Sequence, residues 1–255
     1  MIKLENTKVV GWEEAIRGMR NPMNSWERSD SSTCEYSTII SHCANCPYVK
    51  ECNADDGDIA TKYIIGPNDH DLMMRLAAGG PVHAKYRRMI AVYVDITAPL
   101  YWWKEFDTYK VGTVANSCST MHKIHEKPFV VEDFSVEDLG IDIPADWNDG
   151  EEVYLNLWEE NFKDIVRHLE LLRNRYNNET NPEIKKKFWR AMIQYLPSSY
   201  NQKRTVMLNY EVLAGIYEHR KNHKLDEWVE FCKWIEKLPY SEIITFGGDM
   251  MPGEG

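Results

Sequence analysis

The sequence has no apolar run that approaches the roughly twenty residues a helix needs to cross a membrane. Its first ten residues, MIKLENTKVV, also lack the basic and apolar regions of a secretory signal peptide. We therefore expect a cytoplasmic protein without a membrane partner. The 255 residues contain no internal repeat and no low-complexity tract, and their number favours one main domain over residues 1–255.

Basic charge is also scarce, because 30 Lys and Arg stand against 40 Asp and Glu, a formal net charge of −10. Such a chain repels the phosphate backbone of nucleic acid, which excludes a general nucleic-acid-binding protein unless the basic residues cluster. The best cluster is YNQKRT at residues 200–205. This cluster is large enough for one phosphate group but not for a duplex.

Four of the six cysteines lie close together, namely Cys34, Cys43, Cys46 and Cys52. In the cytoplasm cysteines are thiols or metal ligands more readily than disulfides. The C-x2-C pair places two thiolates on one tight turn, and the two outer cysteines complete a tetrahedral set, so we expect a structural zinc site. The outer spacings differ from those of a standard zinc finger. An iron–sulfur cluster and four unligated thiols in a polar loop therefore stay open as alternatives.

The other two cysteines stand apart from this cluster. Cys232 lies in WVEFCKWI, which has the pattern of an amphipathic helix, and we expect it in the core. Cys118 is a candidate nucleophile if a base lies close to it, and His122 and His125 follow it in the sequence.

The hydrophobic pattern predicts a helix-rich α/β or α+β fold. Residues 89–97, MIAVYVDIT, are apolar and β-branched enough for a buried strand. Residues 129–153 are acidic and rich in turn residues, and residues 31–58 form a cysteine-rich insertion within the domain. Helical spacing or capping residues predict six helices, at residues 11–23, 68–78, 156–176, 182–196, 207–222 and 226–239.

The most informative segment runs from Leu196 to Arg220, LPSSYNQKRTVMLNYEVLAGIYEHR. On a helix, Asn209 and Arg220 project from nearly the same face at a separation of about 16 Å. The simplest interpretation is a core-packed helix whose polar ends reach solvent. The neighbouring pair Lys203 and Arg204 instead favours a phosphate-bearing ligand, because guanidinium groups match phosphate oxygens.

This segment resembles the flavin-dependent thymidylate synthases, also called thymidylate synthase complementing proteins. The family pattern has Leu-Pro, an Asn thirteen residues after the Leu, an Arg eleven residues after the Asn, and often a basic residue six before the Asn. Leu196-Pro197, Asn209, Arg220 and Lys203 occupy these places without a gap.

A second region is similar to the same family. Residues 94–106, VDITAPLYWWKEF, look like the strand and Ala-Pro helix entry that precede the family signature R-H-R-x7-S-x-R. Ser119 matches the signature Ser, and Asn116 matches an Asn that is common within it. The Arg-His-Arg positions fall on Tyr109, Lys110 and Val111, and the final Arg falls on Met121.

Two shorter matches lie upstream. His83, in PVH at residues 81–83, matches a His near the flavin, and Arg17 matches an arginine of the first helix. The similar segments together cover about half of the chain.

The resemblance implies a thymidylate synthase complementing protein-like fold and a homotetramer with sites between subunits. It implies binding of FAD, dUMP, methylenetetrahydrofolate and NADPH, and reductive methylation of the pyrimidine at C5 without a cysteine nucleophile. Arg220 would be the catalytic residue that holds and polarises the uracil. The implied nucleotide-binding residues are Ser119, Asn116, Lys110 and Arg220, and the implied cofactor-binding residues are Asn209, Lys203, His83 and Lys110.

Two hypotheses follow from the altered signature. The first is a divergent flavin-dependent thymidylate synthase, or a relative that methylates a similar pyrimidine nucleotide, with Lys110 and the pair Arg87 and Arg88 as candidate replacements for the missing arginines. The second is a non-catalytic nucleotide-binding or assembly protein that keeps the fold and has lost FAD. In both, the small residues between Phe106 and His122 let backbone groups approach a ligand closely.

Overall fold

The structure is a computed structural model, and it describes residues 1–34, 63–139 and 158–246. The chain divides into two compact units, which are described separately below. Unit 1 comprises Met1, Thr97–Phe106 and Ser117–Lys203, and unit 2 comprises Ile2–Ile96, Asp107–Asn116 and Arg204–Gly255. The single domain over residues 1–255 stays a prediction.

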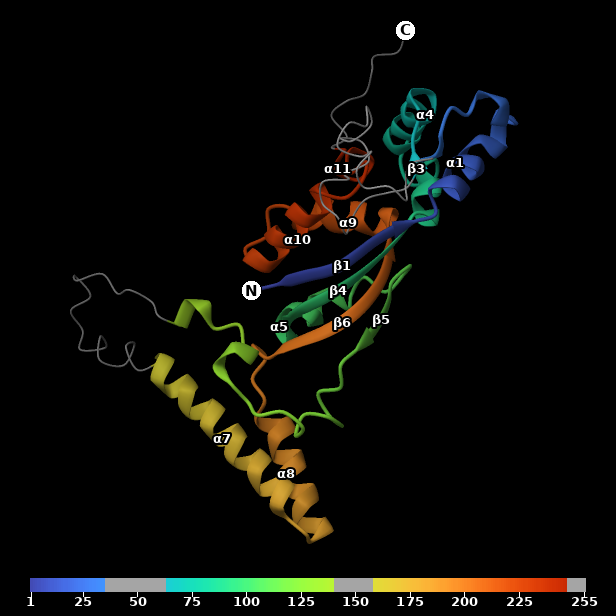
Figure 1. Cartoon of the computed structure of the whole chain (residues 1–255). Coiled ribbons are helices and arrows are strands. Elements are labelled where there is room, and N and C mark those ends of the chain that lie inside the picture. The colour runs from blue at the N-terminus through green and yellow to red at the C-terminus, as the bar shows by residue number, and fades with distance from the viewer. Residues whose placement is uncertain (35–62, 140–157, 247–255) are drawn as a thin grey trace, which may run out of the picture. The chain divides into compact units, whose positions relative to one another are not determined.

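A four-stranded sheet carries the fold, with strand order β1-β4-β6-β5 (Figure 1). Its strands are β1 (Lys3–Val10), β4 (Ala91–Pro99), β5 (Val114–Ser117) and β6 (Asn201–Asn209). The predicted buried strand is confirmed as β4, in which alternate residues from Val92 to Ala98 are buried, so that one face of the strand packs on the core.

The sequence did not predict the other three strands. In β6, Gln202, Val206 and Leu208 are buried on one face. The prediction of one helix over residues 207–222 is wrong for its first three residues, which belong to β6, because α9 (Tyr210–Arg220) begins only at Tyr210.

The helices of unit 2 follow the predicted amphipathic patterns. In α1 (Trp12–Arg20), the buried residues Trp12, Ala15, Ile16 and Met19 lie on one helical face, and the helix ends before Pro22 as predicted. The other helical elements are α4 (Pro67–Ala78), α10 (Asp226–Glu236), α11 (Glu242–Thr245) and the 3-10 helices η1 (Asn21–Met23), η2 (Trp26–Arg28) and η4 (Ala84–Met89).

Helix α10 confirms the predicted place of Cys232. Trp228, Phe231, Cys232 and Ile235 are buried at helical spacing, so the thiol lies in the core. Burial, together with the nearby carboxylate of Glu236, raises the pKa of Cys232 to about 11. A thiol with this pKa is unreactive at neutral pH.

The ends of the predicted insertion are joined by a short ladder. Strands β2 (Ser32–Thr33) and β3 (Tyr63–Ile64) pair antiparallel, with Ser32 opposite Ile64. Cys34, directly after β2, is a buried free thiol. Cys43, Cys46 and Cys52 lie outside the described residues, so the zinc site stays a prediction. Within the described ranges, no group of three or more potential metal ligands occurs.

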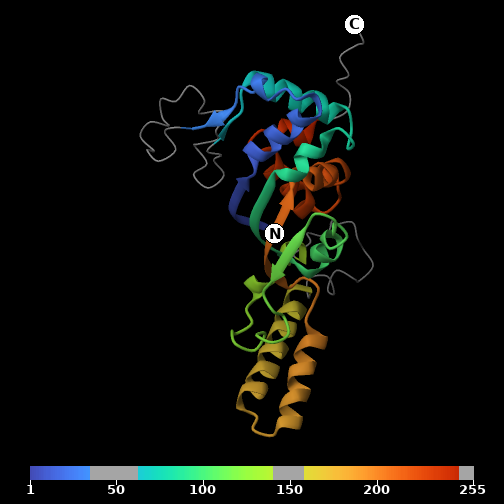
Figure 2. The same cartoon turned by 90° about the vertical axis from the view of Figure 1, so that its right-hand side faces the viewer.

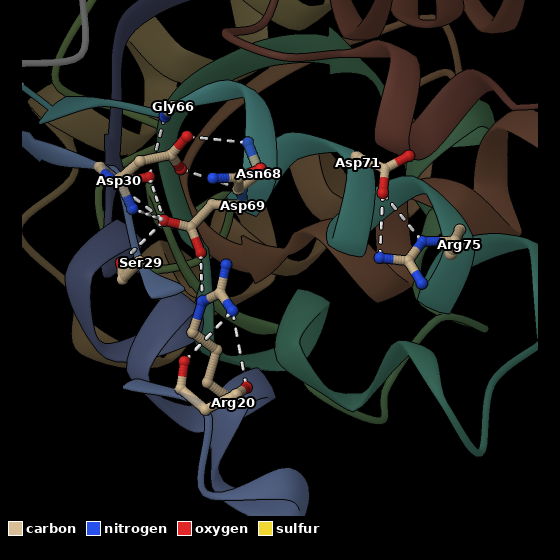
Figure 3. Close-up of polar contacts among 10 residues, drawn as sticks. Arg20, Ser29, Asp30, Gly66, Asn68, Asp69, Asp71 and Arg75 are labelled. Atoms are coloured by element: carbon tan, nitrogen blue, oxygen red, sulfur yellow. Dashed lines mark hydrogen bonds and ion pairs between the residues drawn. The ribbon is translucent and has the colours of Figure 1, made fainter. Parts of the chain in front are cut away.

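A buried ion pair holds α1 against α4 in unit 2 (Figure 3). Arg20 Nε donates to Asp69 Oδ1 at 2.5 Å, and both side chains are almost fully buried. The second carboxylate oxygen of Asp69 accepts hydrogen bonds from the hydroxyls of Ser29 and Ser31 and from the backbone N–H groups of Asp30 and Ser31. Burial opposes ionisation of Asp69, but these hydrogen bonds and the charge of Arg20 lower its pKa.

The same loop supplies the N-terminal cap of α4. The Asp30 carboxylate accepts from the backbone N–H groups of Asn68 and Asp69, the first orphan donors of the helix (Figure 3). Ser31 Oγ in turn accepts from Gly66 N at 2.9 Å. The loop that precedes β2 is therefore tied to the start of α4 by side chains, with the buried Asp69 at the centre.

A second ion pair joins α4 to α11. His70 Nε2 donates to Glu242 Oε1 at 2.6 Å, and both side chains are at least a third exposed. The hydrogen bond to Glu242 raises the pKa of His70. Burial raises the pKa of Glu242, but the hydrogen bond and charge of His70 lower it overall.

This pair predicts a pH-dependent share of stability. The stabilisation from protonated His70 is fully present below pH 6.5, its ordinary pKa, and is lost as the pH rises through its raised pKa. The stabilisation from ionised Glu242 is present above pH 4.5, its ordinary pKa, and is lost as the pH falls through its lowered pKa. Relative to wild type, His70→Gln should lower the free energy of unfolding by up to about 1 kcal/mol between pH 5 and 6 and by almost nothing near pH 9. Urea titrations at the two pH values measure this difference. The exposed His122→Gln serves as control, and an equal loss at both pH values would contradict the prediction.

Unit 1 contains a helical hairpin, α7 (Trp158–Asn178) and α8 (Pro182–Tyr195), which run side by side (Figures 1 and 2). Helix α8 begins as its sequence predicts, because the side chain of Asn181 accepts hydrogen bonds from the N–H groups of Glu183 and Ile184, and Pro182 occupies the first turn. The core of unit 1 comprises Ile124, Phe129, Phe134, Phe162, Val166, Leu169 and Met192.

The remaining described parts of unit 1 are short. Helix α5 (Leu100–Phe106) buries Trp102, Trp103 and Phe106 against one another, with ring centroids 5.0 to 5.2 Å apart. The described part of the acidic stretch has two 3-10 turns, η5 (Val131–Asp133) and η6 (Glu137–Leu139). None of the helices in the described residues combines the length and hydropathy that crossing a membrane requires.

Candidate functional site

The segment that carries the altered signature contacts α9 in unit 2. Arg220 Nε, at the last residue of α9, donates to Tyr109 Oη at 3.0 Å. The Arg220 guanidinium carbon lies 4.8 Å from the ring centroid of Trp228 and 5.8 Å from that of Tyr109. The two rings are themselves 6.0 Å apart. The hydrogen bond to Tyr109 and the contact with two aromatic rings both help to hold the guanidinium.

The same segment contacts the start of α9. Gly112 has φ +80°, and a Cβ there would lie 2.9 Å from Asn209 Nδ2 and 3.2 Å from Val212 Cγ2. Both the left-handed backbone and the close approach require glycine at this position. The segment from Tyr109 to Gly112 thus lies along α9, with contacts at both ends of the helix.

The structure gives Asn209 a different place from the one predicted. Asn209 is the last residue of β6 and the N-cap of α9, where its Oδ1 accepts from Val212 N at 3.0 Å. The prediction that Asn209 and Arg220 share one helical face is therefore wrong, because a capping residue lies outside the helix it caps. The side-chain oxygen of Asn209 caps the helix, and its Nδ2 lies close to the backbone of Gly112.

The rest of the signature segment in unit 2 is open to solvent. Lys110 and Asn116, both predicted to bind the nucleotide, are exposed, and Val111 is 90% exposed. Thr113 Oγ1 is buried and has no hydrogen-bond partner among the described residues. A ligand on this segment would find the Asn116 amide and the Lys110 ammonium group within a few residues.

Two arginines of unit 2 are paired with acids. Arg204 Nη1 lies 2.7 Å from Asp107 Oδ1, so part of the basic cluster at residues 200–205 is neutralised. Arg87 is buried and lies 3.7 Å from Glu211 Oε2 on α9. Arg87 therefore faces a carboxylate of its own unit, whereas Arg88 is exposed.

Unit 1 holds the other predicted ligand-binding residues. Cys118 N donates to the carbonyl oxygen of Lys203 at 2.9 Å, so Lys203 lies beside the segment that carries Ser119. Ser119 Oγ accepts from the N–H groups of Met121 and His122 and closes a turn. Ser119 is exposed, and its hydroxyl hydrogen remains available to a ligand.

Cys118 has no activating partner within the described residues. Its thiol is exposed, and no hydrogen bond joins it to His122 or to His125, whose ring packs on Tyr176 at 4.6 Å. The candidate of a nucleophilic Cys118 thus gains no support from its surroundings.

A large cleft in unit 2 contains His83. Its volume is 1330 Å³, and its walls come from the end of α1, η1, η2, α4 and η4. The His83 ring packs against Gly79, where a Cβ would lie 3.1 Å from the ring. Apolar lining residues include Met19, Met23, Leu72, Leu76, Val82, Tyr86 and Met89. The basic lining residues are Arg20, Arg28, Arg75, His83 and Lys85, and the acidic ones are Glu27, Asp30 and Asp71.

The second upstream match lies outside this cleft. Arg17 is on the exposed face of α1 and is 3.7 Å from Glu13. Sequence reasoning missed the cleft, because the polar and apolar residues that form it come from separate segments between Gly18 and Met89. It also missed Trp228 as a partner of Arg220.

The architecture is the α+β fold of the flavin-dependent thymidylate synthases, as solved structures show. Thymidylate synthase X from Helicobacter pylori, with FAD and dUMP, matches with a TM-score of 0.57 and 15% identity over 96% of this chain and 97% of that chain. The UMP/dUMP methylase PolB from Streptomyces cacaoi, bound with 5-Br UMP, matches with a TM-score of 0.52 and 14% identity over 99% and 97%. No protein-family model matches the sequence, and no curated protein matches it significantly. The predicted fold class is confirmed.

Proposed function

We propose that the protein binds a pyrimidine nucleoside monophosphate, dUMP or a close relative, and methylates its base with the help of a flavin. The observation that best supports this proposal is the contact between two motifs matched separately in the sequence. The signature segment contacts Arg220 through Tyr109 and reaches the start of α9 through Gly112. The similar Helicobacter pylori and Streptomyces cacaoi proteins bind dUMP and a brominated UMP.

In this proposal Arg220 is the catalytic residue. A guanidinium offers planar donors that match the carbonyl oxygens of a uracil ring and withdraw electron density from it. Lys110 supplies a positive charge for the phosphate, and Asn116 supplies an amide to the same nucleotide. A role of Ser119 in nucleotide binding is implied by the family resemblance. Lys203 would border the cofactor, as the resemblance implies.

The cleft around His83 is large enough for a flavin, and its lining includes both apolar and basic side chains. A volume of 1330 Å³ lies above the range of ordinary small-molecule pockets, and Met19, Tyr86 and Met89 offer apolar contacts to a planar ring. Arg28 and Lys85 are cations for a pyrophosphate. A bound flavin would supply reducing equivalents to the transferred methyl group, with NADPH and methylenetetrahydrofolate as co-substrates.

The signature segment offers a flavin less charge than the cleft does. Tyr109 and Val111 replace arginines, and Lys110 is the single cation among residues 107–116. Each lost charge-assisted hydrogen bond weakens phosphate binding by about 1.5–3 kcal/mol. The pyrophosphate would therefore depend on Arg28 and Lys85 rather than on the signature.

This dependence gives the test of the proposal. The purified protein should be yellow, or bind added FAD, and should consume NADPH with dUMP or UMP and methylenetetrahydrofolate. Arg28→Ala should weaken FAD binding about tenfold, because it removes a cation proposed to hold the pyrophosphate, whereas Arg190→Ala, on the exposed surface of α8, should not. Flavin absorbance and fluorescence titrations measure both. A colourless protein that does not bind added FAD would contradict the flavin part of the proposal.

One observation favours a second candidate function. Met121, at the position of the last signature arginine, is 48% exposed and carries no charge. A protein that binds dUMP or UMP but no flavin would be a nucleotide-binding or assembly protein with this fold. Calorimetric titration with nucleotide, beside the flavin titration, distinguishes the two. The homotetramer and the zinc-binding cysteines stay predictions in either case.

A further inference from the structure

The place of Tyr109 is occupied by an arginine in the family that the sequence resembles, yet here its hydroxyl accepts a hydrogen bond from Arg220 Nε at 3.0 Å. Tyr109 and Arg220 are 111 residues apart in the sequence. The contact is therefore made by the fold and not by local geometry. It brings a neutral acceptor to the residue that the proposed function places on the pyrimidine.

The side chains around Arg220 restrict the orientation of its planar guanidinium group. The Trp228 side chain is fully buried, so its ring is a fixed surface, and the guanidinium carbon lies 4.8 Å from it. His223 lies 6.3 Å from the same ring, with its Nδ1 accepting from Leu225 N. The ring contact restricts the guanidinium on one face, and the hydrogen bond from Nε to Tyr109 Oη further restricts rotation within its plane.

The backbone also restricts the position of Tyr109. Gly112, three residues later, is held in the left-handed region against Asn209 and Val212 at the start of α9. Tyr109 is consequently anchored at the far end of the same short segment. The ring and the hydroxyl reach Arg220 from a segment whose path is fixed by the same helix that carries Arg220.

We infer that Tyr109 is a positioning residue, which orients the Arg220 guanidinium for a pyrimidine nucleotide in place of the missing arginine. This inference rests on the proposed function. A preoriented guanidinium loses less conformational entropy when it binds a planar base, so the nucleotide gains affinity without any direct contact to Tyr109. The inference gives the altered signature a role in this chain beyond the loss of charge.

The test compares Tyr109→Phe, which keeps the ring and removes the hydroxyl, with Tyr93→Phe, an exposed tyrosine of β4 in the same unit. The first measurement is hydrogen exchange of the Arg220 Nε–H in the protein without ligand, assigned by its absence in Arg220→Lys. We expect a slow exchange that Tyr109→Phe accelerates and Tyr93→Phe leaves unchanged. Equal exchange in wild type and Tyr109→Phe would overturn the inference.

The second measurement is the Kd for dUMP and for UMP by calorimetry. Tyr109→Phe should raise the Kd about tenfold, corresponding to one lost hydrogen bond to a charged group. Wild-type affinity in Tyr109→Phe, with binding abolished in Arg220→Lys, would overturn the positioning role and leave the proposed function intact. A wild-type protein that binds neither nucleotide overturns the proposed function and the nucleotide part of this inference, whereas the exchange data still decide whether Tyr109 holds Arg220.

Discussion

Replacement of Asp69 by alanine is expected to lower the free energy of unfolding by about 3–5 kcal/mol, because it leaves the buried guanidinium of Arg20 without its counter-ion. Asp69 is fully buried, and Arg20 is 4% exposed. The substitution also removes the acceptor for two hydroxyls and for the backbone N–H groups of Asp30 and Ser31. Urea titrations at neutral pH measure the change.

A matched control lies one half-turn further along the same helix. Asp71 forms an ion pair with Arg75 at 2.9 Å, and both side chains are more than 60% exposed (Figure 3). Exposed pairs of this kind contribute little, so Asp71→Ala should change the free energy of unfolding by no more than about 0.5 kcal/mol. Equal losses in Asp69→Ala and Asp71→Ala would contradict the importance that burial gives to Asp69.

The double variant Arg20→Met with Asp69→Leu separates the charge from the hydrogen bonds. Replacing both partners of a buried pair by apolar residues often restores stability. In this protein the double variant should recover only part of the lost free energy of unfolding, because the backbone N–H groups of Asp30 and Ser31 still lose their acceptor. Since Arg20, Ser29 and Asp30 also line the cleft, Asp69→Ala should weaken flavin binding as well.

Sequence reasoning succeeded where a single buried face leaves a periodic pattern. Helix α1 buries Trp12, Ala15, Ile16 and Met19, and its end is marked by Pro22, so both its face and its boundary could be predicted. Strand β4 was found from composition instead, because its segment is rich in apolar and β-branched residues. Burial of one face constrains residue types locally, and such constraints are visible in one sequence.

The strands at the edges of the sheet left no such pattern. All four residues of β5, Val114–Ser117, are exposed, so this strand is defined by backbone pairing alone. Backbone hydrogen bonds do not depend on residue type, so a segment that forms them without burial shows no periodic pattern in the sequence.

The change from β6 to α9 at Asn209 was missed although the residue is a good N-cap, because the apolar residues on both sides also fit helical spacing.

In the candidate site, too, local motifs could be predicted from the sequence but contacts between distant residues could not. Arg220 and the signature segment were each found from their own motifs, but their contact through Tyr109 joins residues 111 positions apart. The buried pair of Arg20 with Asp69 spans 49 positions. Such pairs depend on how elements pack, which the spacing of residues along one chain does not record.

Substitution of Arg220 by alanine is expected to have the largest effect on ligand binding. If the guanidinium holds the pyrimidine by two charge-assisted hydrogen bonds, their loss raises the Kd for dUMP and UMP by at least about a hundredfold. Arg220→Lys should recover little of this affinity, because an ammonium group cannot reproduce the planar pair of donors or the contact with the Trp228 ring.

The adjacent cation provides the control for this prediction. Lys221 follows Arg220 directly, and its ammonium group lies 3.8 Å from Glu218 on the exposed surface. Lys221→Ala removes the same charge from the same end of α9, so it should leave the Kd within about twofold of wild type. Calorimetric titration of the three variants, each shown to be folded by circular dichroism, makes the comparison. Wild-type affinity in Arg220→Ala would remove Arg220 from the site, whereas equal weakening in Lys221→Ala would mean that only the charge at this end of α9 matters and not the orientation of one guanidinium.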